Sequence, residues 1–355
     1  MKAALSLREV LSVLAGEGLV RPFEDEEFIV EPVSPDSRRS ALPWYVKLFI
    51  GISAWISAIL ITAFFFIVGI IDERQAHFWG VTFCAVAIFM NRLSRGNTFW
   101  VQLSLAMCLT GQVLVIFGLF SLFNDSLPIL IFVTLLEVAL IWLHRDSILR
   151  FISTLVIVIF LLVHILDRNA LNSLHLLIFV LAAGTLVIYL MENRLKLHSL
   201  GEAISPVGYG ITVSFLGILV MPLLEQFDLQ WQITAITLFV LLLFLLSQIV
   251  QDLGYGLQNR VVIALAAGCF LLLVPSLRMP GILAALMVLV LGFWRSNRGL
   301  MGLASIFLVF YIWAYYYSLE WTLLVKSLVL LGSGGILLAV RFFILRFISD
   351  AGDGA

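Results

Sequence analysis

Two charged side chains stand inside long apolar runs of this chain, and they are the residues best placed to do chemistry. Glu137 lies in the segment LLEVALIW, and Lys326 lies in the segment LLVKSL. A charge at the centre of a bilayer costs about 2.5–3.5 kcal/mol or more, so a charged residue kept there is a candidate functional group. If the Glu137 carboxylate and the Lys326 ammonium group formed an ion pair, the pair would offset the cost of burying both charges. Alternatively, the long side chain of Lys326 could extend outward and place its ammonium group in water.

Other polar side chains are expected at a similar depth. Glu137 is ten residues from the start of its predicted helix, which places it about 15 Å deep and near the midplane. Gln112 and the tyrosines 315–317 fall in the half of the membrane that Lys326 enters. We predict a polar, substrate-binding pocket that opens outward. The residues predicted to form it are Glu137, Lys326, His164, His175 and Tyr316. The alternative is a protonated Glu137 bonded to a neighbouring helix, with the histidines and tyrosines at the membrane interface.

The composition indicates that lipid surrounds most of the chain. Hydrophobic residues make up 62% of the 355 residues and charged residues 12%, whereas an average soluble domain has about 25% charged residues. The mean hydropathy is +1.10, and no soluble fold buries that much apolar surface. The net charge of −1 gives no field that would attract nucleic acid. We expect an integral membrane protein whose main partner is the lipid bilayer, without bound nucleic acid.

The sequence lacks the motifs of the common catalytic centres. It contains no phosphate-binding loop, no zinc-protease motif and no nucleophile elbow of a serine hydrolase. The cysteines Cys84, Cys108 and Cys269 lie in apolar runs without paired spacing, so we interpret them as small core residues. No group of His and Cys has the spacing of metal ligands. We expect no cofactor and no metal, and this favours a non-enzymatic role.

The apolar runs predict an all-α, polytopic membrane bundle of about twelve transmembrane helices. A helix needs about 20 apolar residues to cross the ~30 Å hydrocarbon layer, and these runs lack the alternation of a β-barrel strand. The predicted helices span residues 47–71, 77–90, 98–123, 127–143, 148–166, 171–191, 207–224, 231–250, 261–275, 279–294, 299–319 and 322–345. If the short runs 261–275 and 279–294 form a re-entrant hairpin, the number of transmembrane helices falls to ten. Both termini would then remain on the same side of the membrane.

The basic residues sort the loops between these helices into two sides. Of the 21 Lys and Arg residues, nine fall in alternate loops, six in the N-terminal segment and two near the C-terminus, all on one side. Three fall in the opposite loops, and the last is Lys326. Because Lys and Arg concentrate in cytoplasmic connections, we predict that both termini are cytoplasmic. His144 lies on an inner turn beside Arg145 and Asp146, where we expect it to be solvated.

A short soluble segment precedes the first long apolar run. Ser6 and Glu9 have the spacing of a helix-capping pair. The same predicted helix carries an apolar stripe with helical periodicity, formed by Leu7, Val10, Leu11 and Leu14. An acidic cluster at 24–27 and several prolines then predict an irregular linker. The predicted organisation is a cytoplasmic segment at 1–43, a membrane domain at 44–347 and a cytoplasmic tail at 348–355.

The end of the chain carries the most distinctive pattern. Tyr315, Tyr316 and Tyr317 are followed by Leu319, by T-L-L-x-K-S at 322–327 and by a glycine patch at 332–335. Together with the short N-terminal helix and the many apolar helices, this ending resembles a bacterial membrane protein family of unassigned activity, filed as domain of unknown function 4401. The resemblance implies a location in the bacterial inner membrane and allows for a neighbouring membrane protein as partner. It supplies no catalytic residues.

Three hypotheses about function follow. A transporter-like or ligand-binding bundle predicts a cavity in contact with Glu137 or Lys326. A non-catalytic scaffold or subunit of a complex predicts a solid bundle and an exposed stripe on the N-terminal helix. A membrane enzyme acting on a lipid-linked substrate predicts that Glu137, His164 and His175 lie within hydrogen-bond reach of one point. The oligomeric state does not follow from the sequence.

Overall fold

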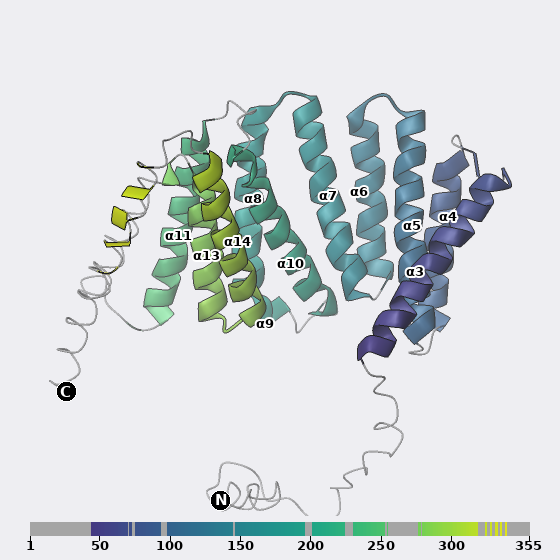
Figure 1. Ribbon diagram of the computed structural model, residues 1–355, viewed down its shortest axis with the longest axis horizontal. Coiled ribbons are helices and arrows are strands. Elements are labelled where there is room, and N and C mark those ends of the chain that lie inside the picture. The colour runs from purple at the N-terminus through teal and green to yellow at the C-terminus, as the bar shows by residue number, and fades with distance from the viewer. Residues whose placement is uncertain are drawn as a thin grey trace, which may run out of the picture.

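The structure, a computed structural model, is helical throughout the part of the chain that it describes. It describes residues 44–69, 71–72, 75–93, 98–144, 146–195, 201–223, 230–252, 254, 276–277, 279–318 and single positions between 324 and 338. Every regular element within these residues is a helix, and Figure 1 shows the long helices standing side by side. The predicted all-α class is confirmed for this part of the chain.

The helix bounds agree closely with the apolar runs. The elements are α3 (Trp44–Ile67), α4 (Ala76–Leu93), α5 (Thr98–Leu122), α6 (Ser126–Leu143), α7 (Ser147–Asp167), α8 (Leu171–Leu190), α9 (Glu192–Leu195), α10 (Gly201–Ile218), the 3-10 helix η2 (Met221–Leu223), α11 (Trp231–Asp252), α13 (Pro280–Trp294) and α14 (Arg298–Ser318). Eight helices of the described part are long and apolar enough to cross a membrane. With 15 residues, α13 is only about 22 Å long.

The predicted number of about twelve transmembrane helices is not confirmed. The helix expected at 261–275 lies outside the described residues, as does most of the one expected at 322–345. The re-entrant alternative depends on 261–275 and therefore stays a prediction. The amphipathic stripe of the N-terminal segment also lies outside the described residues, and the proposed domain boundaries remain untested.

The long helices from α3 to α11 run in alternating directions along the chain, and α7 links two groups of helices (Figure 1). On one side of α7, α3 and α4 pack on α5, and α6 packs on α7 itself. On the other side, α10 packs on α7 and α8, α8 packs on α11, and α13 packs on α11 and α14. We call the end that holds the α6–α7 turn the inner end, and the end that holds the α5–α6 and α7–α8 turns the outer end.

The helices α4 and α5 pack closely along a seam that is built from small residues. A methyl group placed on Gly80 would lie 2.6 Å from the carbonyl oxygen of Gly111 and 2.6 Å from the backbone nitrogen of Val115. A methyl group on Gly118 would meet the backbone of His77. Small residues stabilise membrane helix pairs because they bring backbones into van der Waals contact. The two glycines of α5 and Gly80 therefore set the spacing of this pair.

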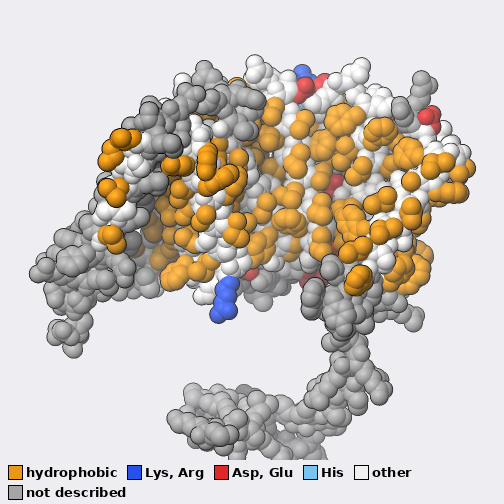
Figure 2. All heavy atoms as spheres, viewed as in Figure 1, with side chains coloured by type: hydrophobic (Ala, Val, Ile, Leu, Met, Phe, Trp, Pro, Cys, Tyr) orange, Lys and Arg blue, Asp and Glu red, His pale blue; other side chains and the backbone are white. Residues whose placement is uncertain are grey.

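The surface of the bundle suits a lipid environment. Large apolar side chains are exposed along many helices, for example Phe64 on α3, Leu135 on α6 and Ile306 on α14. Hydrophobic side chains cover the visible face between the two ends of the helices, and most charged atoms lie at those ends (Figure 2). In water such a face would be an aggregation site, but hydrocarbon chains are as apolar as the side chains that meet them.

Candidate functional site

Glu137 is fully buried in the middle of α6, at the meeting point of three helices. The buried residues of α6 form one stripe, Ile129, Val133, Glu137 and Leu140, so the carboxyl group faces into the bundle. The amide nitrogen of Gln112, on α5, donates to Glu137 Oε2 at 2.9 Å. The same nitrogen donates to the hydroxyl oxygen of Ser153, on α7, at 3.3 Å. Glu137 Oε1 has no hydrogen-bond partner among the described residues.

Apolar layers enclose this polar centre above and below. Toward the outer end lies a buried cluster of Val115, Leu119, Ile129 and Val133. Toward the inner end lies a second cluster, which includes Cys84, Leu105, Cys108, Leu140 and Leu149. Cys84 and Cys108 are buried and free, as the sequence predicted, while Cys269 lies outside the described residues. A layer of packed apolar side chains thus separates Glu137 from each end of the bundle.

A second polar group lies below the inner layer, and the sequence did not predict its burial. His144 was expected to be solvated, but its side chain is buried where α6 ends, and its ring contacts the side-chain amide of Asn91 at 2.9 Å. Arg150 is also buried, in the first turns of α7. Its Nε donates to the carbonyl oxygens of Ile141 at 3.1 Å and His144 at 3.2 Å. These side chains remain inside because backbone acceptors near the turn satisfy the guanidinium group.

The ionisation of His144 is biased by this packing. Burial lowers the pKa of His144, and the nearby Arg150 cation lowers it further, while Asp146 acts in the opposite direction. Asp146 is also the N-cap of α7, since its carboxylate accepts from the backbone nitrogens of Ile148 at 2.8 Å and Leu149 at 3.2 Å. The neutral form of His144 is therefore the favoured form near neutral pH.

His164 lies at the outer end and makes contacts of its own. Its Nδ1 is 2.8 Å from the hydroxyl of Ser126, and this hydroxyl donates to Asp167 at 2.6 Å. Ser126 precedes Glu137 by eleven residues on α6, which is about 16 Å along the helix axis. Beside this group, Arg168 forms an exposed ion pair with Asp125 at 2.7 Å. His164 therefore belongs to the α6–α7 outer rim.

The other predicted pocket residues lie on further helices. His175, on α8, is bonded to the hydroxyl of Thr234 on α11 at 2.7 Å. Tyr316 is half-buried near the end of α14 and stacks edge-on against Tyr317, with ring centroids 5.5 Å apart. Lys326 lies outside the described residues. Among the described residues, the structure brings Glu137 together with Gln112 and Ser153. It gives His164, His175 and Tyr316 other partners.

The residues that the sequence analysis missed carried a periodic signal. Ser153 follows Arg150 by three residues, so the two share one face of α7. His144 follows Glu137 by seven residues and lies directly after the end of α6. Arg150 bonds to the carbonyl oxygens of Ile141 and His144, so this face of α7 turns toward the end of α6. Counting polar residues by depth alone overlooked Ser153, because a lone serine in a transmembrane helix is common. Its position one turn from a buried arginine distinguishes it.

The comparisons with known proteins concern the family of the chain. No curated protein and no solved structure matches it. The chain matches the protein family described as a domain of unknown function (DUF4401), and the match covers residues 43–347. This range holds every helix of the described bundle. The resemblance that the chain's ending suggested is therefore confirmed, and the protein belongs to the DUF4401 family.

Proposed function

We propose that this protein is a membrane transport protein that moves protons through its α4–α7 part by protonation and deprotonation of Glu137. The observation that supports the proposal is a fully buried carboxyl group near mid-membrane, with one oxygen held by Gln112 and the other without a described partner. Intramembrane carboxyl groups are costly to keep, and they mark proton relays and ion pathways in pumps and transporters.

The enclosure of Glu137 favours the proton over a larger solute. Apolar clusters close the centre on both sides, so a solute could enter only if the helices separated, whereas a proton needs only a short-lived chain of hydrogen bonds. Gln112 suits both forms of the carboxyl group, because an amide carries a donor and an acceptor. The Ser153 hydroxyl can rotate to donate or accept in the same way.

The polar groups below Glu137 suggest that access is from the inner end. Arg150 bonds to the carbonyl oxygen of Ile141, which lies about 6 Å below Glu137 along the helix axis. Toward the outer end, the side chains at Val133 and Ile129 are apolar, and the next polar partner on the α6 stripe is at Ser126. We extend the proposal to a protein of the bacterial inner membrane with cytoplasmic termini, so that the inner end faces the cytoplasm.

The two alternative hypotheses have less support in the described contacts. An enzyme would gather Glu137, His164 and His175 at one point, but these side chains bond to Gln112, Ser126 and Thr234 respectively. A scaffold would need no polar centre at all, and a buried carboxyl group costs stability in a protein that only supports a partner. An outward-opening pocket that includes Lys326 stays a prediction.

Infrared difference spectroscopy after a pH jump tests the proposal on the purified protein in lipid bilayers. Wild type should show the carbonyl band of a carboxyl group that gains and loses a proton, and Glu137→Gln should lack this band. Asp252→Asn is the matched control, because Asp252 is an exposed acid at the end of α11. If Glu137→Gln keeps the band of wild type, Glu137 does not titrate and the proposal fails.

Proton movement itself is measured in proteoliposomes that carry an imposed pH gradient and an internal pH dye. Wild type and Asp252→Asn should dissipate the gradient faster than empty liposomes, and Glu137→Gln should match empty liposomes. A titrating band together with equal gradient decay in wild type and Glu137→Gln would show protonation without transport. That result would also contradict the proposed function.

A further inference from the structure

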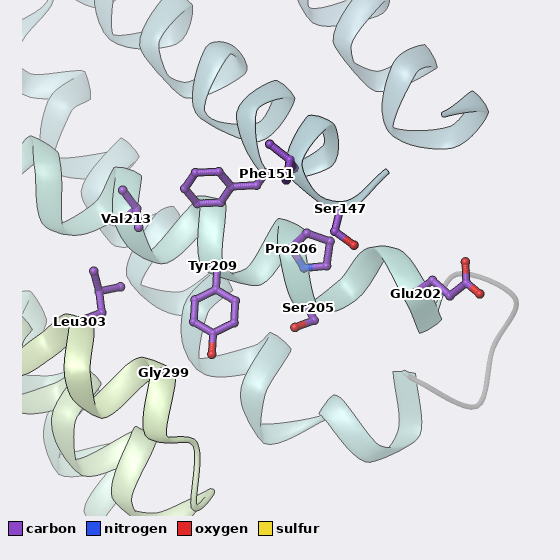
Figure 3. Close-up of a pocket in the computed structure, with 10 residues that line it drawn as sticks. Ser147, Phe151, Glu202, Ser205, Pro206, Tyr209, Val213, Gly299 and Leu303 are labelled. Carbon is purple, nitrogen blue, oxygen red and sulfur yellow. The ribbon is translucent and has the colours of Figure 1, made fainter. Parts of the chain in front are cut away.

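A cleft opens between three helices of the bundle, away from Glu137. It has a volume of about 580 Å³ and lies between α7, α10 and α14, within the ~300–1,000 Å³ of small-molecule sites. Its walls are apolar, with Phe151, Val213 and Leu303 among them. Figure 3 shows the ring of Tyr209 standing between these walls, with Ser147, Ser205 and Glu202 toward one end. The cleft is thus amphipathic along its length.

The length of the cleft matches one leaflet of a bilayer. Glu202 lies in the first turn of α10, and Val213 follows eleven residues later, which is about 16 Å along the helix axis. This is close to half of the ~30 Å hydrocarbon layer. The polar end lies where α7, α10 and α14 all begin, which is the inner end of the bundle. An acyl chain of the inner leaflet would therefore lie along the apolar walls.

The polar end of the cleft is rich in hydrogen-bond acceptors. Pro206 has no N–H group, so the backbone carbonyl of Glu202 lacks its usual helical partner. The carboxylate of Glu202 and the hydroxyls of Ser147 and Ser205 line the same end. A donor with several N–H groups and a positive charge would satisfy these acceptors. The exposed cation of Arg298 directly precedes the lining residue Gly299, and it suits a neighbouring phosphate.

We propose that this cleft binds a phospholipid with a primary-amine headgroup, taken from the leaflet at the inner end. The ammonium group would bond to the Glu202 carboxylate and its backbone carbonyl, and one acyl chain would follow Phe151, Val213 and Leu303. The charge pattern selects this lipid, because an anionic headgroup without an amine places no cation at Glu202. A choline headgroup has the charge but no N–H donor.

Native mass spectrometry of the full protein, released from nanodiscs, measures lipid retention. The nanodiscs contain equal amounts of phosphatidylethanolamine, phosphatidylcholine and phosphatidylglycerol. Wild type should retain phosphatidylethanolamine preferentially. Glu202→Gln should lower this preference by about two- to fivefold, the effect of a partly exposed ion pair. Asp252→Asn, an exposed acid at the same end of the bundle, should leave the preference unchanged.

Filling the cleft gives a second, independent test. Leu303→Trp adds a large side chain to the apolar wall and should reduce retention of every lipid. Equal retention by wild type, Glu202→Gln and Leu303→Trp would overturn the site, and preferential retention of phosphatidylglycerol would overturn the amine assignment. If Leu303→Trp does not fold, the Glu202→Gln comparison still decides, because this change is at an exposed side chain.

Discussion

The close packing of α4 against α5 predicts that a methyl group added at Gly80 destabilises the protein. Replacing Gly80 with alanine places a methyl group 2.6 Å from two backbone atoms of α5, the Gly111 oxygen and the Val115 nitrogen. Ordinary van der Waals contact begins at about 3.4 Å. The two helices must therefore separate locally by about 0.8 Å, because neither obstacle is a flexible side chain that can rotate away.

The cost follows from the contacts that this separation weakens. A gap of 0.5–1 Å forfeits about a quarter to a half of each dispersion contact across the seam, and overpacked sites typically lose about 1–3 kcal/mol. Alanine also gains about 1 kcal/mol over glycine in helix propensity. Gly217→Ala, on α10, is the matched control because no described atom lies within 4 Å of its added methyl group. We expect Gly80→Ala to be about 1–3 kcal/mol less stable than Gly217→Ala.

The free energy of unfolding is measured by reversible titration with SDS in mixed micelles, followed by circular dichroism. Comparing the two alanine variants cancels the propensity gain, so their difference reports the packing of the seam. Gly111→Ala should behave like Gly80→Ala, since its methyl group would lie 2.7 Å from the Gly80 oxygen. If Gly80→Ala is as stable as Gly217→Ala, α4 and α5 do not approach as closely as the seam requires.

Three further predictions address charge and hydrogen bonding. Burial lowers the pKa of His144 from 6.5, so the unfolded chain binds this proton more readily and stability falls as the pH drops below about 6.5. Thermal unfolding between pH 5.5 and pH 8 should show this loss in wild type and a smaller loss in His144→Gln. Arg168→Gln breaks an exposed ion pair with Asp125 and should cost at most about 1 kcal/mol, an effect that salt should reduce. Tyr209→Phe removes a 2.8 Å hydrogen bond to Asn297, and SDS titration should show a loss of about 0.5–1.5 kcal/mol.

The helices could be predicted because the length of an apolar run is read directly from the sequence. An apolar run of 18–25 residues must cross the bilayer as a helix, and the described helices begin and end within a few residues of such runs, with few exceptions. α10 is one exception: it begins at Gly201, six residues before its predicted start, since Pro206 is tolerated inside the helix. Tertiary packing decides such boundaries.

The candidate site was only partly predictable, because depth does not determine which neighbour a side chain faces. Glu137 and Gln112 were both expected among the buried polar groups, and they are bonded to each other. His164 and His175 were grouped with them by depth, but they lie on faces that meet Ser126 and Thr234. The pairing of helix faces is a property of the whole bundle, and one sequence does not contain it.

The distribution of buried polar groups also bears on the direction of proton access. On the inner side, Arg150 places a hydrogen bond one turn below Glu137, and the buried His144 follows directly after the end of α6. On the outer side, the α6 stripe is apolar for about 16 Å, through Val133 and Ile129. A water molecule needs two to four polar partners to enter a buried site. Transient hydration therefore costs less from the inner end, so in the proposed transport cycle the outer apolar layer is the barrier that must open.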